Sequence, residues 1–193
     1  LDEAGGAATV RRRMVGPTHL SPRAEAGRAL FFDATNTHLT PSGVVTCGTC
    51  HPGGGDDGLS WFLHTRRVPR KLRRTPPAWS AKATLAPYHW DGEFADASTL
   101  ARAAIVELME GDALVVELAA IAAYMDEVRP PPPRPLEAAR RQAGRAVFER
   151  EAVGCATCHP APQYADGRRH AVLSASADAD GVLAEVDTPT LRG

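Results

Sequence analysis

The pattern of apolar and polar positions predicts three helices in the first two thirds of the chain. Residues 21 and 22 are Ser-Pro, a helix N-cap followed by proline at the first helical position, and they open a predicted helix over residues 21–32. Ser98 is expected to cap a second helix, which ends near Gly111. Asp112 is expected to cap a third helix. Its apolar face is formed by Leu114, Leu118, Ile121 and Met125. The predicted fold class is all-α.

A proline run divides the chain. Residues 129–135 hold a stretch of consecutive prolines, which cannot be helical and which forms a stiff extended connector. The first residues are small and polar, so residues 1–20 are expected to be a linker or a frayed N-terminus. The predicted organisation is a first domain over 21–128, a proline-rich linker over 129–136 and a second domain over 137–193.

The two predicted domains are related by an internal repeat. Residues 25–31 are echoed by residues 141–148, and residues 74–77 are echoed by residues 187–190. A repeat of this kind indicates two copies of one module. The first copy continues through two further predicted helices, whereas the second copy has reached only its Thr-Pro element at Gly193. The second domain is therefore expected to be incomplete, as a fragment or as a module completed by another subunit.

All 4 cysteines lie in two copies of Cys-x-x-Cys-His. The first copy is Cys47, Cys50 and His51, and the second is Cys155, Cys158 and His159. This spacing is typical of c-type haem attachment, in which two thiols bind the vinyl groups and the next histidine is the proximal iron ligand. The sequence predicts two covalently attached haems.

Two other interpretations use the same cysteines. Paired Cys-x-x-Cys units can form a tetrahedral zinc site, and a single pair can be a thioredoxin-like dithiol. A zinc site does not explain why a histidine directly follows both cysteine pairs. A redox dithiol does not explain why the chain has two such pairs. Haem attachment is therefore the favoured interpretation.

The ligand on the far side of each haem decides whether the iron is closed or open to substrate. For the first haem the candidates, in order, are Met109 at a predicted helix end, His64 in the loop after the motif, and His89. Each residue also has a structural interpretation without a haem. Met109 could be a core methionine, His64 a solvated loop residue and His89 a hydrogen-bonded structural residue. No methionine follows Cys158, so the second haem would use His170, a ligand beyond the given sequence, or none.

Charge and hydropathy restrict the partners. The formal charge is −1, and no basic run is interleaved with aromatic residues, so nucleic acid is not an expected partner. Residues 66–74 are rich in Lys and Arg and could dock an acidic electron donor, or could be a solvated loop.

No segment has the roughly 20 apolar residues of a membrane span. Haem attachment of this kind takes place outside the cytoplasm, so a periplasmic or otherwise extracytoplasmic location is expected, with export signals upstream of Leu1.

Several short segments occur in a fixed order along the chain. They are Gly-Arg-Ala-Leu-Phe-Phe, Cys-x-x-Cys-His, Arg-Thr-Pro-Pro and Ala-Pro-Tyr-His-Trp-Asp-Gly, then Gly-Arg-Ala-Val-Phe, Cys-x-x-Cys-His, Tyr-Ala-Asp-Gly and Asp-Thr-Pro-Thr-Leu-Arg-Gly. With this order, residues 21–193 resemble the bacterial di-haem cytochrome c peroxidase superfamily, which also holds the MauG-type enzymes. The resemblance implies two mostly helical cytochrome c-like domains with the haems facing their interface.

The resemblance also implies roles for individual residues. Trp90 would lie between the haems and assist electron transfer. The His51 haem would react with hydrogen peroxide, and the His159 haem would accept electrons from a small donor protein of the cytochrome c or cupredoxin type. Glu110 falls near the family's acid/base glutamate, and His64 near its displaceable histidine.

Two features depart from the stand-alone peroxidases. Arg74 stands where they have an asparagine that helps to hold an interdomain calcium, which argues against calcium here. The glycine-rich loop after His51 and the His-Trp-Asp-Gly segment look more like di-haem modules attached to larger extracytoplasmic proteins. If Met109 ligates the first haem, peroxide has no open iron there. The expected function is electron transfer between two haems, with peroxide reduction as its enzymatic version and a non-catalytic electron-relay module as the alternative.

Overall fold

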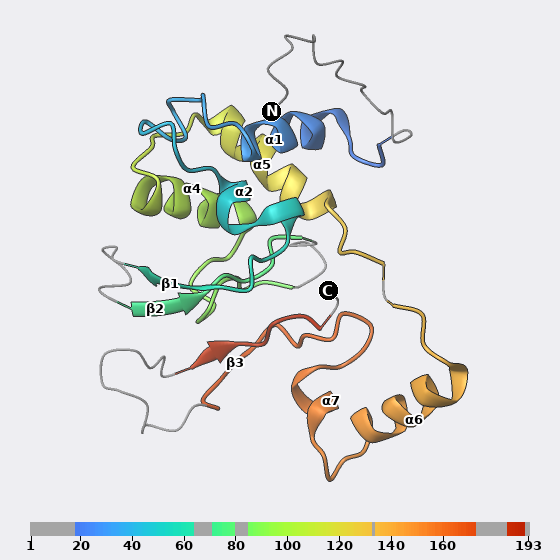
Figure 1. Ribbon diagram of the computed structural model, residues 1–193. Helices are drawn as coiled ribbons and strands as arrows, with labels where there is room; N and C mark the ends of the chain where they lie inside the picture. The colour runs from blue at the N-terminus through green and yellow to red at the C-terminus, as the bar shows by residue number, and fades with distance from the viewer. Residues whose placement is uncertain (1–17, 64–70, 80–84, 133, 173–184, 192–193) are drawn as a thin grey trace, which may run out of the picture.

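The computed structural model describes residues 18–63, 71–79, 85–132, 134–172 and 185–191 (Figure 1). Within these ranges the chain forms six α-helices, one short 3-10 helix and two small sheets. The helices are α1 (Pro22–Phe31), α2 (Cys47–Cys50), α4 (Ala97–Leu108), α5 (Val115–Glu127), α6 (Ala138–Phe148) and α7 (Cys155–Cys158), with the 3-10 helix η1 (Pro52–Gly54). The protein is helix-rich, as predicted, and compatible with a cytochrome c-like fold.

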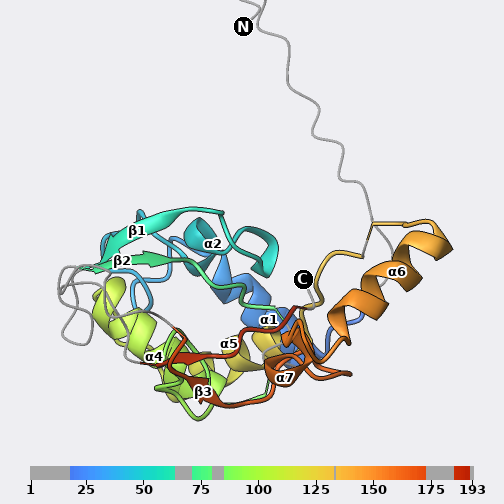
Figure 2. The same ribbon diagram turned by 90° about the horizontal axis from the view of Figure 1, so that it is seen from below.

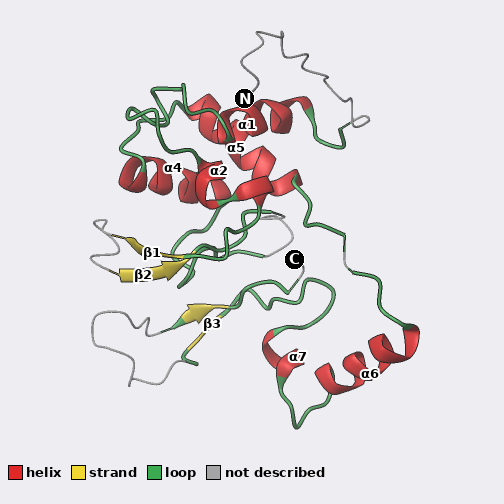
Figure 3. Cartoon of the chain, in the orientation of Figure 1, coloured by secondary structure: helices red, strands yellow, loops and turns green. Residues whose placement is uncertain are grey.

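Two short pairs of strands accompany the helices, which the all-α prediction did not include. Strand β1 (Ser60–Leu63) pairs antiparallel with β2 (Lys71–Arg74), and β3 (Arg169–His170) pairs antiparallel with β4 (Val186–Asp187). They are the short yellow segments between long loops in Figure 3. The segment before Arg74, expected to be irregular, is in part a strand because Leu72 and its neighbours find a backbone partner in β1. Partner residues in the register run from Leu63 and Lys71 to Ser60 and Arg74, so they are separated by a loop that a local sequence pattern does not span.

Helix α1 begins where the Ser-Pro pair predicts. The hydroxyl of Ser21 accepts a hydrogen bond from the N–H of Ala24 (3.2 Å), as an N-cap does. The same hydroxyl donates to the carboxylate of Glu127 (2.7 Å), which also accepts from the N–H of Ser21 (2.6 Å). The start of α1 is thereby fastened to the end of α5.

Helices α1, α4 and α5 enclose the hydrophobic core of residues 18–128, which we call the first module. Gly27 of α1 lies so close to α5 that a Cβ atom there would be 1.9 Å from the carbonyl oxygen of Ala120. The core cluster is formed by Phe31, Leu39, Ala78, Ala97, Ala101, Ile105, Met109, Ala113, Leu118, Ile121, Tyr124, Met125 and Val128. Close approach at a glycine lets these apolar faces meet, and their burial stabilises the module.

Helix α4 begins two residues earlier than predicted. Its N-cap is Asp96, whose carboxylate accepts from the N–H of Thr99 (2.8 Å), so the prediction of Ser98 as the cap is wrong. The hydroxyl of Thr99 donates in return to the carbonyl of Asp96 (2.9 Å). This pair of bonds stabilises the earlier start, and Ser98 lies inside the first turn.

Helix α5 begins after Leu114, not after Asp112 as predicted. The N–H of Asp112 is bound to the carbonyl of His38 (2.7 Å), which keeps that residue in the preceding loop. The carboxylate of Glu117 instead accepts the N–H of Leu114 (2.8 Å). Leu114 is half exposed and does not share the buried face of Leu118, Ile121 and Met125.

Residues 134–191, which we call the second module, repeat the beginning of the first. Helix α6 precedes the one-turn helix α7 as α1 precedes α2. Figures 1 and 2 show α6 apart from α1, α4 and α5 in both directions of view. In contrast to Gly27, Gly144 has no atom within 4 Å of the position that a Cβ would take. No helix in the described ranges is long and apolar enough to cross a membrane.

Candidate haem-binding sites

The first Cys-x-x-Cys-His motif forms a single helical turn. In α2 the two cysteines are three residues apart and therefore lie on the same side of the turn. The N–H of Thr46 donates to the hydroxyl of Thr49 (3.0 Å), which closes the turn at its beginning. His51 directly follows the turn and its N–H donates to the carbonyl of Cys47 (2.9 Å). The motif thus presents two thiols and one imidazole from a compact unit.

One ring nitrogen of His51 makes a hydrogen bond to the backbone, which orients the ring. Its Nδ1 lies 3.0 Å from the carbonyl oxygen of Gly55. A carbonyl only accepts, so Nδ1 carries the proton and Nε2 keeps a lone pair, the arrangement that a metal-ligating histidine requires. Burial lowers the pKa of His51, and this also favours the neutral ring.

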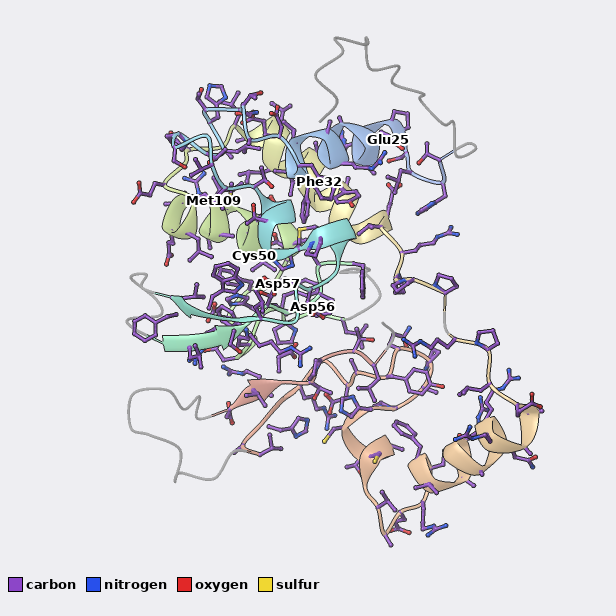
Figure 4. The ribbon with its side chains drawn as sticks, viewed as in Figure 1. Glu25, Phe32, Cys50, Asp56, Asp57 and Met109 are labelled. Carbon is purple, nitrogen blue, oxygen red and sulfur yellow. The ribbon has the colours of Figure 1, made fainter. Side chains whose placement is uncertain are left out.

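The cysteines of the first motif are partly buried thiols. Burial raises the pKa of Cys47 to about 11 and also raises that of Cys50, with a further contribution from the charge of Asp57. Figure 4 labels Cys50 and Asp57, whose charge acts on this thiol. Zinc needs thiolates, and in the described part of the chain no three His, Cys, Asp or Glu side chains gather into a metal site. Haem attachment to Cys47 and Cys50 stays the favoured prediction.

The second motif has the same geometry. The N–H of His159 donates to the carbonyl of Cys155 (3.0 Å), and its Nδ1 donates to the carbonyl of Tyr164 (2.9 Å). The backbone angles are φ −116° and ψ 59° at His159, against −117° and 63° at His51. The two motifs differ at their start, where Gly154 has a left-handed φ of 78°. Both sets of residues fit a covalently attached haem with a histidine ligand.

Trp90 lies where the two modules meet. Its indole N–H donates to the carbonyl of Arg74 (2.8 Å), and its own carbonyl accepts from the N–H of Asp187 in β4 (3.0 Å). The guanidinium of Arg73 lies over the indole, 5.7 Å from its centre, at a distance typical of a cation–π contact. The structure therefore joins Trp90 to both modules by hydrogen bonds, and its predicted position between the haems stays a prediction.

His89 and Glu93 form a hydrogen-bonded pair beside Trp90. The Nδ1 of His89 lies 2.5 Å from Oε1 of Glu93, and the imidazole and indole centres are 3.6 Å apart. Both side chains line a hollow beneath α4, together with Leu63, Trp90, Phe94, Leu100, Ala103, Ala104, Glu107 and Leu108. Glu93 was not among the residues predicted for the site. Its spacing of four residues from His89, across the Asp-Gly turn, is the signal that could have found it.

The other predicted residues of the first haem lie away from this pair or outside the described residues. Met109 follows α4 and is 9% exposed, packed in the core cluster with Phe31 and Leu39 (Figure 4). Glu110 follows it with a φ of 58° and is exposed. Glu107 lines the hollow and Glu110 does not. His64 lies outside the described residues, so its prediction as a displaceable ligand stays a prediction.

His170 of the second module is held by a carboxylate. Its Nε2 lies 2.8 Å from Asp166, which also accepts the N–H of Arg168 (3.0 Å). This bond occupies Nε2 of His170, and ligation of the second haem by His170 stays a prediction. The same region contains Asp187, whose pKa is raised to about 7, chiefly by burial.

Comparison with known proteins adds a family and a fold. The sequence model of the family described as di-haem cytochrome c peroxidase matches residues 21–151. Hydrazine synthase of Kuenenia stuttgartiensis has a similar structure, with a TM-score of 0.67 and 19% identity over 97% of this chain and 83% of that chain. A MauG-like protein associated with microbial copper homeostasis has a TM-score of 0.62 and 18% identity, over 94% and 69% of the two chains. No curated protein matches. At these identities the two structures show a shared fold alone.

Proposed function

We propose, from the premise that this chain belongs to the di-haem cytochrome c peroxidase family, that it binds two haems covalently and transfers electrons between them. One observation carries the proposal: in each Cys-x-x-Cys-His motif a backbone carbonyl accepts a hydrogen bond from Nδ1–H, which leaves the lone pair of Nε2 available to iron. Family members bind haem c, and two equal motifs support two haems in this chain. The modules that carry them are proposed to be residues 21–128 and 137–193, joined by the linker 129–136.

Each haem, when bound, supplies an iron that gains and loses one electron. The protein contributes fixed ligands: Cys47 and Cys50 would hold the first haem and Cys155 and Cys158 the second, with His51 and His159 as proximal ligands. The carbonyls of Gly55 and Tyr164 orient these histidines through a rigid backbone. The proximal histidines would therefore move little when the iron of a bound haem gains or loses an electron.

Trp90 is proposed to provide the route between the haem sites. Its ring belongs to the first module, and its carbonyl is hydrogen-bonded to β4 of the second (3.0 Å). The cation of Arg73 over the indole disfavours positive charge on the ring, so the indole would serve as a bridge and not as a stable radical. A small redox protein of the cytochrome c or cupredoxin type is the proposed donor to the His159 haem.

Reduction of hydrogen peroxide at the His51 haem is the finer proposal. Splitting peroxide with two electrons and two protons needs a group that moves protons beside the bound substrate. Glu110 is the residue that the family resemblance assigns to this role, and Glu107 is a second carboxylate, in the wall of the hollow that holds His89. The covalent attachment of haem supports a location outside the cytoplasm.

A non-catalytic electron-relay module is the alternative. A filled and unreactive sixth position at the first haem would select it, because peroxide then finds no open iron.

The test begins with haem content and a spectrum of the purified protein, produced in a host that attaches haem c. We expect two haems per chain, and one after replacement of both cysteines of either motif by serine. The reduced protein is then mixed with a few equivalents of hydrogen peroxide. Rapid reoxidation with turnover supports peroxide reduction, and a low-spin reduced spectrum that peroxide barely changes supports the relay. A colourless protein would contradict both.

A further inference from the structure

The small sheet of β1 and β2 has an apolar face that is open to solvent. Phe62 of β1 pairs directly with Leu72 of β2, and side chains that pair across a sheet lie on the same face. Their exposed fractions are 68% and 61%. The next residue of β2, Arg73, is only 8% exposed and lies over the ring of Trp90. Phe62 and Leu72 therefore form an uncovered apolar pair on what we call the outer face of this sheet.

The sequence of this sheet and of the segment that joins its strands carries a concentrated positive charge. Residues 59–74 contain 6 of the 22 Lys and Arg residues and none of the 23 Asp and Glu residues, in a chain whose formal net charge is −1. Arg74 lies two residues beyond Leu72 in β2 and therefore on the outer face. Its side chain is 70% exposed and lies 3.7 Å from Asp56, and an ion pair so open to water contributes little. The outer face thus combines an apolar centre with positive charge.

Strand β2 also links the outer face to Trp90. The carbonyl of Arg74 accepts the indole N–H of Trp90 (2.8 Å), and the guanidinium of Arg73 lies 5.7 Å from the indole centre. The carbonyl of Trp90 in turn accepts the N–H of Asp187 in the second module (3.0 Å). A protein seated on the outer face would be separated by β2 from the ring that is proposed to join the haem sites. This connection favours a redox protein over a lipid surface as the occupant.

Charge complementarity specifies the kind of redox protein. Opposite charges steer two proteins together, and apolar contacts at the centre of an interface exclude water. The surface that complements the outer face therefore has carboxylates around an apolar centre.

We propose that the outer face of the β1–β2 sheet binds a small redox protein with an acidic surface, and that electrons enter the chain there by way of Trp90. The metal of the partner gives up one electron and one ferric haem iron of this chain takes it up, with no bond formed or broken. Electron entry rests on the proposed function, because it requires bound haem. Binding itself requires only the residues of the outer face.

The probes are two cupredoxins, one of negative and one of positive net charge, each titrated into the oxidised holoprotein by calorimetry. We expect the acidic cupredoxin to bind with an affinity that falls as salt is added, and the basic one to bind about tenfold more weakly. Phe62→Ser/Leu72→Ser is expected to weaken binding of the acidic protein about tenfold. The matched control is Val115→Ser/Val116→Ser, at the start of α5, where the side chains are 80% and 71% exposed. Its affinity should equal that of the parent.

Arg74→Gln tests the charge of the outer face. The variant keeps the backbone carbonyl that binds Trp90, so we expect a weaker salt dependence of binding with an unchanged haem content. Stopped-flow reduction by the acidic cupredoxin should be slower in Phe62→Ser/Leu72→Ser than in the parent. Reduction by dithionite, which needs no docking surface, should be equally fast in both.

The inference would be overturned if the acidic cupredoxin failed to bind, or if the parent and Phe62→Ser/Leu72→Ser bound it equally well. An equal loss in Val115→Ser/Val116→Ser, or a salt dependence unchanged by Arg74→Gln, would also contradict it. Phosphatidylglycerol vesicles are the probe for the other occupant. If they bound the parent and not Phe62→Ser/Leu72→Ser, while the cupredoxin bound neither, the outer face would belong to a lipid surface.

The failure of this inference can be distinguished from the failure of the proposed function. Two haems per chain and normal reduction by dithionite would leave the proposed electron-transfer function intact in every case above. A lower haem content would contradict the proposed function itself.

Discussion

Single hydrogen bonds define the chemistry of the histidines in this protein. The carbonyls of Gly55 and Tyr164 fix Nδ1 of His51 and His159, and the carboxylate of Glu93 does the same for His89. A carbonyl partner makes a neutral ligand, whereas a carboxylate partner makes a more basic one. The group that accepts the hydrogen bond from Nδ1–H is therefore expected to be one determinant of the reduction potential at each proposed haem site.

Two carboxyl groups next to the module contact are expected to respond to pH with opposite sign. Burial raises the pKa of Asp187 from 3.8 in the unfolded chain to about 7. The folded protein binds this proton more tightly, so the stability it contributes is full below pH 3.8 and is lost as pH rises through about 7. Asp187→Asn keeps a neutral group at all pH values. We expect the variant to be more stable than the parent at pH 8 and little different at pH 4, as measured by denaturant unfolding.

Asp166→Asn is the control with the opposite expectation. Burial raises the pKa of Asp166, but bonds from Thr188, His170 and the N–H of Arg168 outweigh it, so the net shift is downward. This carboxylate stabilises the folded protein above its unfolded pKa of 3.8, and the contribution is lost as pH falls through the lower folded value. The variant is expected to be less stable than the parent at neutral pH. A parallel response of the two variants would contradict the assignment.

Helix pairing distinguishes the two modules at the level of elements. Helix α1 crosses α5 at Gly27, and the end of α5 is fastened to Ser21 through Glu127. Helix α6 carries the same Gly-Arg-Ala sequence around Gly144, yet all its described side chains are exposed or only partly buried. The same local sequence therefore makes a core helix in one module and a surface helix in the other.

The two equivalent glycines provide a matched pair of substitutions. A Cβ at position 27 would lie 1.9 Å from the Ala120 carbonyl oxygen and would push α1 away from α5. We expect Gly27→Ala to destabilise the protein by about 1–3 kcal/mol, the usual cost of overpacking. Gly144→Ala meets no atom within 4 Å and is expected to stabilise α6 by about 0.5–1 kcal/mol. Guanidinium unfolding of both holoproteins measures the difference, and equal effects would contradict the crossing at Gly27.

The two modules meet along the loop that contains Trp90. The N–H of Asp187 bonds to the Trp90 carbonyl (3.0 Å), and Gly167 approaches residues 85 and 86 closely enough that a Cβ would be 2.9 Å from the Ala86 carbonyl oxygen. At the scale of the whole molecule, this contact joins the parts that carry the two motifs. Electron exchange between them should depend on it.

Gly167→Ala is expected to weaken the contact between the modules. Gly167 has a φ of 65° and Gly58 has a φ of 70°, but a Cβ at Gly58 meets nothing within 4 Å. Both alanine variants should lose about 1–2 kcal/mol from left-handed backbone strain. Only Gly167→Ala should also slow electron transfer between the haems, as followed by stopped-flow reduction. Equal rates in the two variants would show that the loop contact does not control transfer.

The sequence by itself determined the haem motifs, the internal repeat and the start of α1. Each depends on residues that are adjacent in the chain: Cys-x-x-Cys-His is contiguous, and Ser21 caps a helix that begins at the next residue. The order of motifs also led to the correct family. Local chemistry needs no knowledge of distant partners.

Only the tertiary structure decided the remaining features. The start of α5 depends on a bond from Asp112 to His38, the strand pairs join separated segments, and Trp90 meets Asp187 from the other module. The His89–Glu93 pair spans four residues, but the burial that gives it significance comes from the folded loop and from α4. The physical reason is that hydrogen bonds and burial between distant residues exist only after the chain has folded.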